Sequence, residues 1–405
     1  MQKLLLHISL LFIALLIVPC CSSISPEMTA AGNAVVSDTL NAWLEIDTLQ
    51  FRKNIEYLKE VIGDKHKICV VMKGDAYGNG ITTLMPTIIS QNIERVAITS
   101  NEEARDVRNS GYKGKIMRIR IATVGEIREG IALGIEELIG DFDHAEIVND
   151  IAKEQDTTIN FHLAINANGM SRNGIELSNG YEEALKLLNL SNLKCIGMMT
   201  HYPANKDGEI MQQLQRFKQQ TTTLISKAGL RRQDLILSTA ATYAALYIPE
   251  SRMDMVRVGS ALYNYGYTEK FSAFKKIMSF KTRITSIQDF PAGNTVSYKR
   301  TYSLKRNSRL ANLPVGYANG ISTAIANKGY VLIRGHKCPI VGNVTMNIMM
   351  ADVTDYPDIT IGDEVVLYGK QGQNEITAAD IGAWTGTNLL SQSMFWAKAN
   401  QKIAK

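Results

Sequence analysis

The residue whose type and position most clearly suit it to chemistry is a lysine at the end of an apolar run. Val70, Val71 and Met72 precede Lys73, and residues 74–80 read GDAYGNG. Burial at a strand end removes water from the amine, lowers its pKa and frees it to act as a nucleophile or base. The glycines after it allow a ligand to approach the backbone closely. Spacing alone leaves a second interpretation, a lysine that ends a strand in an ion pair.

Other unusual polar residues also follow short apolar runs, namely Arg120, Asn166, His201 and Thr239. The runs at 67–72, 95–99, 115–120, 158–163, 195–199 and 235–238 are typical of buried parallel strands. Helical patterns lie between them at 101–109, 125–132, 145–153, 181–188 and 210–227. This order predicts an α/β protein with a (β/α)8 barrel, and residues that follow the strands of such a barrel gather at one end.

The sequence changes character after about residue 275. Alternating β-branched residues with turn signals occur at 281–284, 329–335 and 362–369. They predict a second, mostly antiparallel β domain. We therefore expect a barrel over residues 40–275 and a C-terminal β domain over residues 276–405.

The start of the chain differs from the rest. Lys3 precedes an apolar run from Leu4 to Val18, which is typical of a secretory signal peptide and short for a membrane span. We expect residues 1–25 to be this signal and the protein to be periplasmic. A buried helix or a membrane anchor remains an alternative for this segment. A lipid on Cys20 or Cys21 is another, and for the exported protein we expect membrane attachment only if it carries this lipid.

Charge and cysteine content narrow the function classes. The 405 residues carry 44 Lys+Arg against 39 Asp+Glu without a long basic run, so we expect no nucleic-acid partner. Cys69, Cys195 and Cys338 remain after a signal, and an odd number cannot pair fully within one chain. No Cys/His cluster has zinc spacing, and we expect no metal.

The segment from Lys73 to Gly80 resembles the pyridoxal-phosphate lysine motif of the alanine racemase family. Similar segments follow the family's order at 42–47, 200–202, 254–263, 296–298, 314–320 and 341–346. The resemblance implies an amino-acid racemase in which Lys73 holds pyridoxal 5'-phosphate as a Schiff base and Tyr77 hydrogen-bonds its phosphate. It also implies that Thr239, Gly259 and Ser260 contact the phosphate.

The resemblance assigns further roles. Arg257 would donate to the pyridine nitrogen and keep it unprotonated, which weakens the cofactor as an electron sink. Lys73 and Tyr298 would be the two bases, with His201 linking Tyr298 to Arg257. The family solution is a head-to-tail homodimer in which the partner supplies this tyrosine. Taken alone, Arg257 could instead pair with Asp254, Tyr298 could be a strand tyrosine and His201 a satisfied barrel histidine.

Three stretches depart from the family. Ser238 and Thr239 stand where Asn-Ser is usual, and Asn388 follows Gly386-Thr387 where a phosphate-binding tyrosine is expected. Residues 161–174 lack the lysine that becomes carboxylated in the family, which leaves Arg172 without its usual partner, so an anion such as chloride or a different donor network must replace it.

The third departure resembles the exported broad-spectrum amino-acid racemases and implies a pocket wide enough for basic side chains. The implied substrate-binding residues are Arg118, Arg120, Asn166, Arg172, Asn173 and the backbone of Met346. From pattern alone, Arg118 and Arg120 could be solvated strand-end charges. The competing functions are a narrow alanine racemase, a barrel-type amino-acid decarboxylase and a non-catalytic pyridoxal-phosphate-binding protein.

Overall fold

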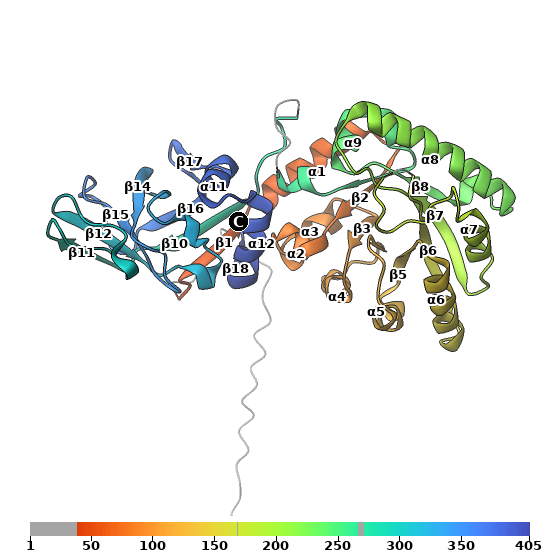
Figure 1. The fold of residues 1–405 in the computed structure, drawn as a ribbon, viewed down its shortest axis with the longest axis horizontal. Helices are drawn as coiled ribbons and strands as arrows, with labels where there is room; N and C mark the ends of the chain where they lie inside the picture. The colour runs from red at the N-terminus through yellow and green to blue at the C-terminus, as the bar shows by residue number, and fades with distance from the viewer. Residues whose placement is uncertain (1–38, 168, 266–270) are drawn as a thin grey trace, which may run out of the picture. The chain divides into compact units, whose positions relative to one another are not determined.

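The computed structural model describes residues 39–167, 169–265 and 271–405. The segment expected to be a signal peptide lies outside the described residues together with Cys20 and Cys21, so that expectation stays a prediction. Figure 1 shows the described chain as a series of strands and helices followed by a second, strand-rich part.

Eight parallel strands form the first sheet, in the order β8-β7-β6-β5-β4-β3-β2-β9. They are β2 (Lys67–Val71), β3 (Arg95–Ile98), β4 (Lys115–Arg118), β5 (Ile135–Ile139), β6 (Ile159–Ala164), β7 (Leu193–Met199), β8 (Ile236–Ser238) and β9 (Met255–Val258). The end strands meet through a parallel bridge between Ala241 and Arg257, and Arg257 N donates to Ala240 O at 2.9 Å. The expected barrel is therefore confirmed.

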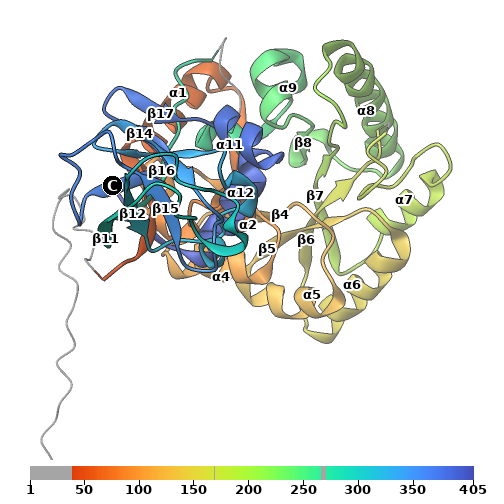
Figure 2. The same cartoon turned by 60° about the vertical axis from the view of Figure 1, so that its left-hand side comes forward.

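Helices between the strands cover the outside of this barrel, and Figure 2 shows several of them around the strands. They are α1 (Thr48–Ile62), α3 (Ile81–Ser90), α4 (Asn101–Asn109), α5 (Val124–Gly130), α6 (Phe142–Glu154), α7 (Tyr181–Leu188), α8 (Asp207–Lys227), α9 (Thr242–Tyr247) and the short α10 (Ser260–Tyr263). Single 3₁₀ turns lie at Ile131–Leu133, Arg232–Asp234 and Pro249–Ser251. In α4, Ala104 and Val107 are buried while Ser100 caps the N-terminus, which explains why this segment forms a helix.

Two barrel strands were not among the apolar runs read from the sequence. β5 contains Glu136 and Glu137, and both carboxylates are buried in ion pairs. Arg95 holds Glu136 at 2.9 Å, and Arg118 holds Glu137 at 2.8 Å. Charged residues inside a strand hide its apolar pattern, but paired charges can be buried. β9 is hidden in the same way because it carries the buried Arg257.

A second, mostly antiparallel sheet forms the C-terminal domain, which confirms its expected class. Its strands are β1 (Ala42–Ile46), β10 (Met278–Arg283), β11 (Ser286–Phe290), β12 (Ser308–Leu313), β13 (Tyr330–Ile333), β14 (His336–Val341), β15 (Met349–Asp352), β16 (Glu364–Gln371), β17 (Asn374–Ile376) and β18 (Gln401–Ala404). Its helices are α11 (Ala378–Thr385) and α12 (Leu389–Ala399), with 3₁₀ turns at Tyr298–Arg300, Tyr317–Asn319 and Thr323–Ile325.

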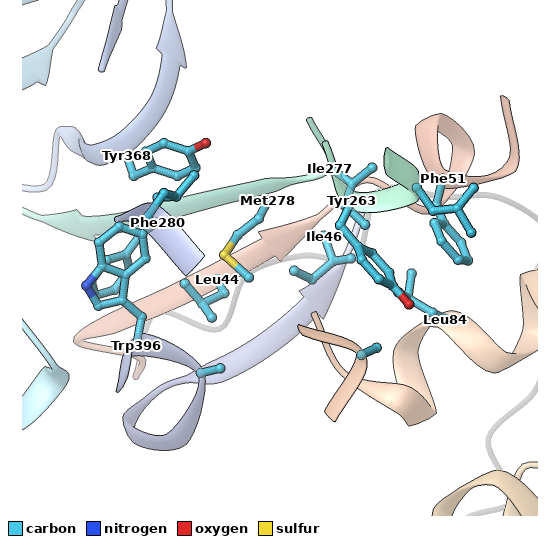
Figure 3. Packing of buried hydrophobic residues seen from close by; sticks show 14 of the residues in the cluster. Leu44, Ile46, Phe51, Leu84, Tyr263, Ile277, Met278, Phe280, Tyr368 and Trp396 are labelled. Atoms are coloured by element: carbon cyan, nitrogen blue, oxygen red, sulfur yellow. The ribbon is translucent and has the colours of Figure 1, made fainter. Parts of the chain in front are cut away.

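The first strand differs from the expected domain boundary. β1 lies within the range expected for the barrel, but it pairs antiparallel with β10 and parallel with β18. Its Leu44 and Ile46 are buried beside Met278, Phe280 and Trp396 in one hydrophobic cluster (Figure 3). Burial of these side chains stabilises the strand in the second sheet, so both ends of the described chain belong to the C-terminal domain.

The hydrophobic cluster of Figure 3 also joins the two domains. It contains Phe51 of α1, Leu84 of α3 and Tyr263 of α10 together with side chains of the second sheet.

Among the described residues, no helix combines the length and apolar character needed to cross a bilayer. Within the same residues, no group of three or more His, Cys, Asp or Glu side chains could hold a metal ion.

Candidate active site

A pocket of about 260 Å³ lies at the carboxyl ends of the barrel strands. It brings together most of the site residues expected from the sequence, which come from the ends of four strands, β2, β6, β7 and β9, and the loops after them. These are Lys73, Tyr77, Asn166, Arg172, Asn173, His201, Arg257, Gly259 and Ser260. Ligand sites of barrel proteins occupy this end, so the position alone indicates a functional site.

Lys73 begins a short left-handed turn, Lys73–Tyr77, labelled α2 in Figure 1. Gly74, Asp75, Ala76 and Tyr77 have φ of 64°, 52°, 53° and 57°. Such a backbone costs about 1–2 kcal/mol for each residue that carries a Cβ. Strain of this kind persists only where the surroundings enforce it, and it concentrates at functional sites.

The electrostatic environment of Lys73 favours a neutral amine. Burial lowers the pKa of Lys73, the positive Arg172 lowers it further, and Glu103 opposes the change. Within the described ranges, no carboxylate lies within ion-pair distance of the Lys73 amine. The alternative of an ion-paired strand end therefore has no support in the geometry, and Lys73 is placed to act as a nucleophile or base.

Arg257 is buried at the pocket wall with a fixed orientation. Its Nη1 donates to Ser238 Oγ, and its Nη2 donates to Thr200 O at 2.8 Å. Burial lowers its pKa to about 10, so the guanidinium stays charged at neutral pH. Asp254, the alternative partner, is instead bound by Arg232 at 2.8 Å. The part of the chain that the structure describes offers no acceptor for the Arg257 Nε–H, which leaves that donor for a ligand.

The side of the pocket beside Tyr77 presents hydroxyls and a close backbone approach. A Cβ on Gly259 would lie 2.7 Å from Tyr77 Oη, so only glycine lets the tyrosine hydroxyl reach this position. Ser260 Oγ donates to Thr242 Oγ1 at 3.1 Å, and Gly259 N donates to the same oxygen at 3.3 Å. Convergent hydroxyls and a backbone amide are the donor set that a phosphate needs.

Thr239 is a correction to the expected phosphate contacts. Its side chain is fully buried and its hydroxyl donates to Ser251 O at 2.7 Å. The pocket hydroxyl comes instead from Thr242, three residues later, which sequence reasoning missed. A threonine at the start of a helix is too common a signal to single out, so only the fold distinguishes the two.

The pocket lining also includes Arg172 and two asparagines, Asn166 and Asn173. No side chain of the described residues pairs with the Arg172 guanidinium, in line with the missing lysine of this stretch. Asn166 is held by a hydrogen bond from its Nδ2 to Glu176 Oε2 at 3.1 Å, and Asn173 lines the pocket beside it. An unpaired guanidinium in a pocket suits a carboxylate, which it can bind through two parallel hydrogen bonds.

His201 faces the same space without a positive charge. Burial and the charges of Arg257, Arg172 and Lys73 lower its pKa to about 3. The imidazole is therefore neutral at physiological pH and can both donate and accept a hydrogen bond.

Arg118 is a further correction, because it does not line the pocket, and Arg120, which does not line the pocket of its own chain either, keeps its expected role only as a prediction. Arg118 is fully buried in the barrel wall and donates to Glu137, to Asn101 Oδ1 and to a backbone carbonyl. Burial raises the pKa of the Glu137 carboxyl, and the Arg118 charge opposes that rise. Arg120 is held by Glu126 at the start of α5. The alternative of solvated charges is also wrong for Arg118, which stabilises the wall instead.

Tyr298 and Met346 lie in the C-terminal domain and do not line the pocket of their own chain. Their exposed fractions are 73% and 55%, and Tyr317 and Ile348 are also exposed large residues of this domain. Ser297, just before the tyrosine, has φ of 63° and donates from Oγ to Asn343 O at 2.8 Å. The roles expected for Tyr298 and Met346 remain predictions.

Comparison with known proteins covers both domains of the chain. The chain matches the family models for the alanine racemase N-terminal domain over residues 46–266 and C-terminal domain over residues 277–395. It is 41% identical to a lysine racemase of Proteus mirabilis, over 94% of this chain and 93% of that protein. It is also 41% identical to a broad specificity amino-acid racemase of Pseudomonas putida, over 93% and 92%.

Solved structures show the same architecture. An alanine racemase of Clostridium difficile 630 matches with a TM-score of 0.83 at 25% identity, covering 91% of this chain and 97% of that one. Sequence and fold thus agree over both domains, and the chain belongs to the alanine racemase family.

Proposed function

We propose that the protein is a pyridoxal-phosphate-dependent amino-acid racemase of broad specificity. One observation carries the proposal: a pocket at the barrel end combines the amine of Lys73, whose pKa is lowered, with two guanidinium groups, Arg172 and Arg257. Among the described lining residues there is no carboxylate. Such a pocket suits a ligand that carries a phosphate and a substrate that carries a carboxylate.

The residues present fit the cofactor. Lys73 would hold its aldehyde through the amine, while Tyr77, Thr242 and Ser260 would hold its phosphate with the Gly259 backbone. The free Nε–H of Arg257 would meet the ring nitrogen, and a permanently charged donor leaves that nitrogen without a proton. When bound, pyridoxal phosphate supplies an electron sink for the electron pair left at Cα.

The protein's own groups move the proton. Racemisation takes a proton from one face of Cα and returns one to the other, so two acid/base groups must flank the substrate. Lys73 Nζ serves one face, because its lowered pKa favours the neutral form that accepts a proton. We assign the other face to Tyr298 of the partner subunit, whose phenol needs nearby positive charge to act as a base. Arg172 binds the substrate carboxylate.

Broad specificity follows from neutral amides in the pocket lining. Asn173 and Asn205 can donate or accept there, while Asn166 is held by bonds to Glu176 and Ser171, so the pocket sets no strict charge requirement on the substrate side chain. The carboxylated lysine of narrow alanine racemases has no counterpart here. The two relatives named for lysine and for broad specificity support the same conclusion.

A head-to-tail homodimer completes the proposed site. Tyr298, Tyr317, Met346 and Ile348 are large exposed side chains of the C-terminal domain, and they would lie against the partner's pocket. Mixing Lys73→Ala and Tyr298→Phe subunits tests this arrangement. If sites are shared, random exchange restores about a quarter of the wild-type activity from two inactive parents. Failure to restore any activity, with mixed dimers detected by mass, would refute shared sites.

We also propose export to the periplasm, on the strength of Lys3 and the apolar run from Leu4 to Val18. Osmotic-shock fractionation followed by N-terminal sequencing tests it. A shortened, unlipidated protein in the shock fluid is expected, whereas a full-length protein in the cytoplasm would refute export.

The activity itself is tested with purified protein and a panel of L-amino acids, following D-isomers by chiral chromatography and the bound cofactor by absorbance. D-lysine, D-arginine and D-alanine are expected. D-alanine alone would indicate a narrow alanine racemase, carbon dioxide and amines a decarboxylase, and cofactor without turnover a binding protein.

A further inference from the structure

One carboxylate joins the Lys73 turn to a neighbouring helix. Glu103 Oε1 accepts from Gly74 N at 2.5 Å and from Asp75 N at 3.3 Å. Its Oε2 accepts from Thr99 N at 2.7 Å, from Thr99 Oγ1 at 3.0 Å and from Ser100 N at 3.3 Å. Both oxygens are thus used, one for each segment, and the residue is 9% exposed.

A helix cap explains only half of these contacts. Glu103 is the third residue of a capping box at the start of α4, where such a side chain satisfies the N-cap backbone. Asp380 occupies the same position in α11, and it binds only Thr377, through N and Oγ1, both at 2.7 Å. The bonds from Glu103 to Gly74 and Asp75 go beyond the cap.

The turn needs such an external acceptor. Its own hydrogen bonds run from Ala76 N to Met72 O at 2.6 Å and from Gly78 N to Gly74 O at 2.9 Å, so the amides of Gly74 and Asp75 are left for another partner. The left-handed conformation also costs about 1–2 kcal/mol for each residue with a Cβ, and contacts from outside the turn must offset this cost. Glu103 is the partner of those first two amides.

The other side of the turn is held separately. Asn79 Nδ2 donates to Ala76 O at 2.8 Å, and Tyr265 Oη donates to Tyr77 O at 3.0 Å. Helix α12 contacts α2, and a Cβ on Gly74 would meet Met394 at 3.1 Å. The bonds from Asn79 and Tyr265 fix the end of the turn, and the bonds to Glu103 hold the amides at its beginning, next to Lys73.

We propose that Glu103 is a positioning residue: its carboxylate fixes the left-handed turn so that the Lys73 amine and the Tyr77 hydroxyl face the same pocket. The inference rests on the proposed role of Lys73 in the proposed function. Because one carboxylate spans both segments, the catalytic amine is held at a constant place relative to the barrel wall.

Glu103 also acts on the charge of Lys73. The charged or titratable groups near this amine include Arg172, which lowers its pKa, Glu103, which raises it, the neutral His201 and Tyr77, whose ring centroid lies 5.9 Å from Lys73 Nζ. Removing the negative charge of Glu103 should lower the pKa of Lys73 further. The loss of charge alone produces this shift, so the shift tests the proximity of Glu103 to Lys73, whereas amide exchange in the turn tests the positioning.

The test uses the full chain without cofactor or substrate, so its outcome is separate from racemase activity. Glu103→Gln keeps the size of the side chain but turns an NH₂ group toward N–H donors on one side. Hydrogen exchange of peptides spanning residues 73–80 and the pH profile of Lys73 acetylation by acetic anhydride are followed by mass spectrometry. Asp380→Asn is the matched control because it weakens a cap away from the turn.

We expect at least tenfold faster exchange in the turn of Glu103→Gln and an acetylation midpoint at lower pH, with wild-type values for Asp380→Asn. If Glu103→Gln does not fold, Glu103→Asp replaces it, since the shorter side chain can keep the cap but cannot also reach Gly74. Unchanged exchange at residues 73–80 in the folded variant would overturn the proposal and leave Glu103 as a helix cap, whatever the acetylation midpoint, because the loss of charge alone moves the midpoint. A change in these readouts without racemase activity in the wild type would uphold the positioning and refute the proposed function.

Discussion

Gly259→Ala tests the close approach of Tyr77 to the backbone. The added Cβ would lie 2.7 Å from Tyr77 Oη and 2.9 Å from Cζ, well inside normal contact distance. The Tyr77 ring cannot move away easily, because its centroid lies 5.0 Å from that of Tyr263 and 6.2 Å from that of Tyr265. The φ of the glycine, −132°, is not in the left-handed region that favours glycine, so the contact with Tyr77 dominates the expected effect.

The expected magnitude is that of one hydrogen bond to a charged group. Displacing the tyrosine hydroxyl from a phosphate loses about 1.5–3 kcal/mol. At 1.4 kcal/mol per factor of ten, this corresponds to a pyridoxal phosphate Kd raised about 10- to 150-fold. Tyr77→Phe should give a similar loss, and the double variant should lose little more, because both changes remove the same contact.

The assay is titration of the cofactor-free protein with pyridoxal phosphate, followed by quenching of protein fluorescence. Gly125→Ala is the control, since a Cβ there meets nothing within 4 Å. An unchanged Kd in Gly259→Ala, or fully additive losses in the double variant, would show that Tyr77 does not contact the phosphate.

Three further predictions concern charge. The pKa of His201 is about 3 in the folded chain and ordinarily 6.5, so between these pH values the unfolded chain binds a proton that the folded chain does not. The free energy of unfolding should therefore fall as pH drops from about 6.5 towards 3, and urea titrations should show a shallower fall in His201→Asn. Arg118→Leu leaves Glu137 buried and unpaired, so the free energy of unfolding measured by urea titration should fall by about 3–5 kcal/mol. A raised KM with normal stability would instead restore the substrate-binding role of Arg118. Arg172→Leu should raise KM for amino acids about 10- to 100-fold with an unchanged cofactor Kd, and an equal loss of cofactor affinity would contradict the carboxylate assignment.

Much of the fold could be predicted from the sequence because apolar runs and amphipathic segments alternate from residue 67 onwards. Strands β5 and β9 were missed because Glu136, Glu137 and Arg257 interrupt their apolar pattern, and only the fold shows that these charges are paired or hydrogen-bonded inside the barrel. The placement of β1 was missed because a strand carries no mark of the sheet that it joins. Long-range pairing with β10 and β18 decides that.

The site could be predicted where a family motif fixes the residue, as for Lys73 and Arg257, and less well where the fold decides which neighbour reaches the pocket. Thr239 and Thr242 have the same hydroxyl, but a strand-end turn buries the first and exposes the second to the pocket. Arg118 looks like a ligand residue until Glu137 of the neighbouring strand is placed beside it. Such assignments depend on which strands are adjacent in the barrel.

The proposed two-base racemisation at this pocket is tested most directly by exchange in deuterated water with Tyr298→Phe. The substitution removes only a hydroxyl, so the absorbance of the lysine-bound cofactor should stay unchanged. Racemisation should fall about 10²- to 10⁴-fold, while one enantiomer of the substrate still exchanges its Cα hydrogen through Lys73. Racemisation at the wild-type rate, or exchange from both enantiomers at equal rates, would contradict the account.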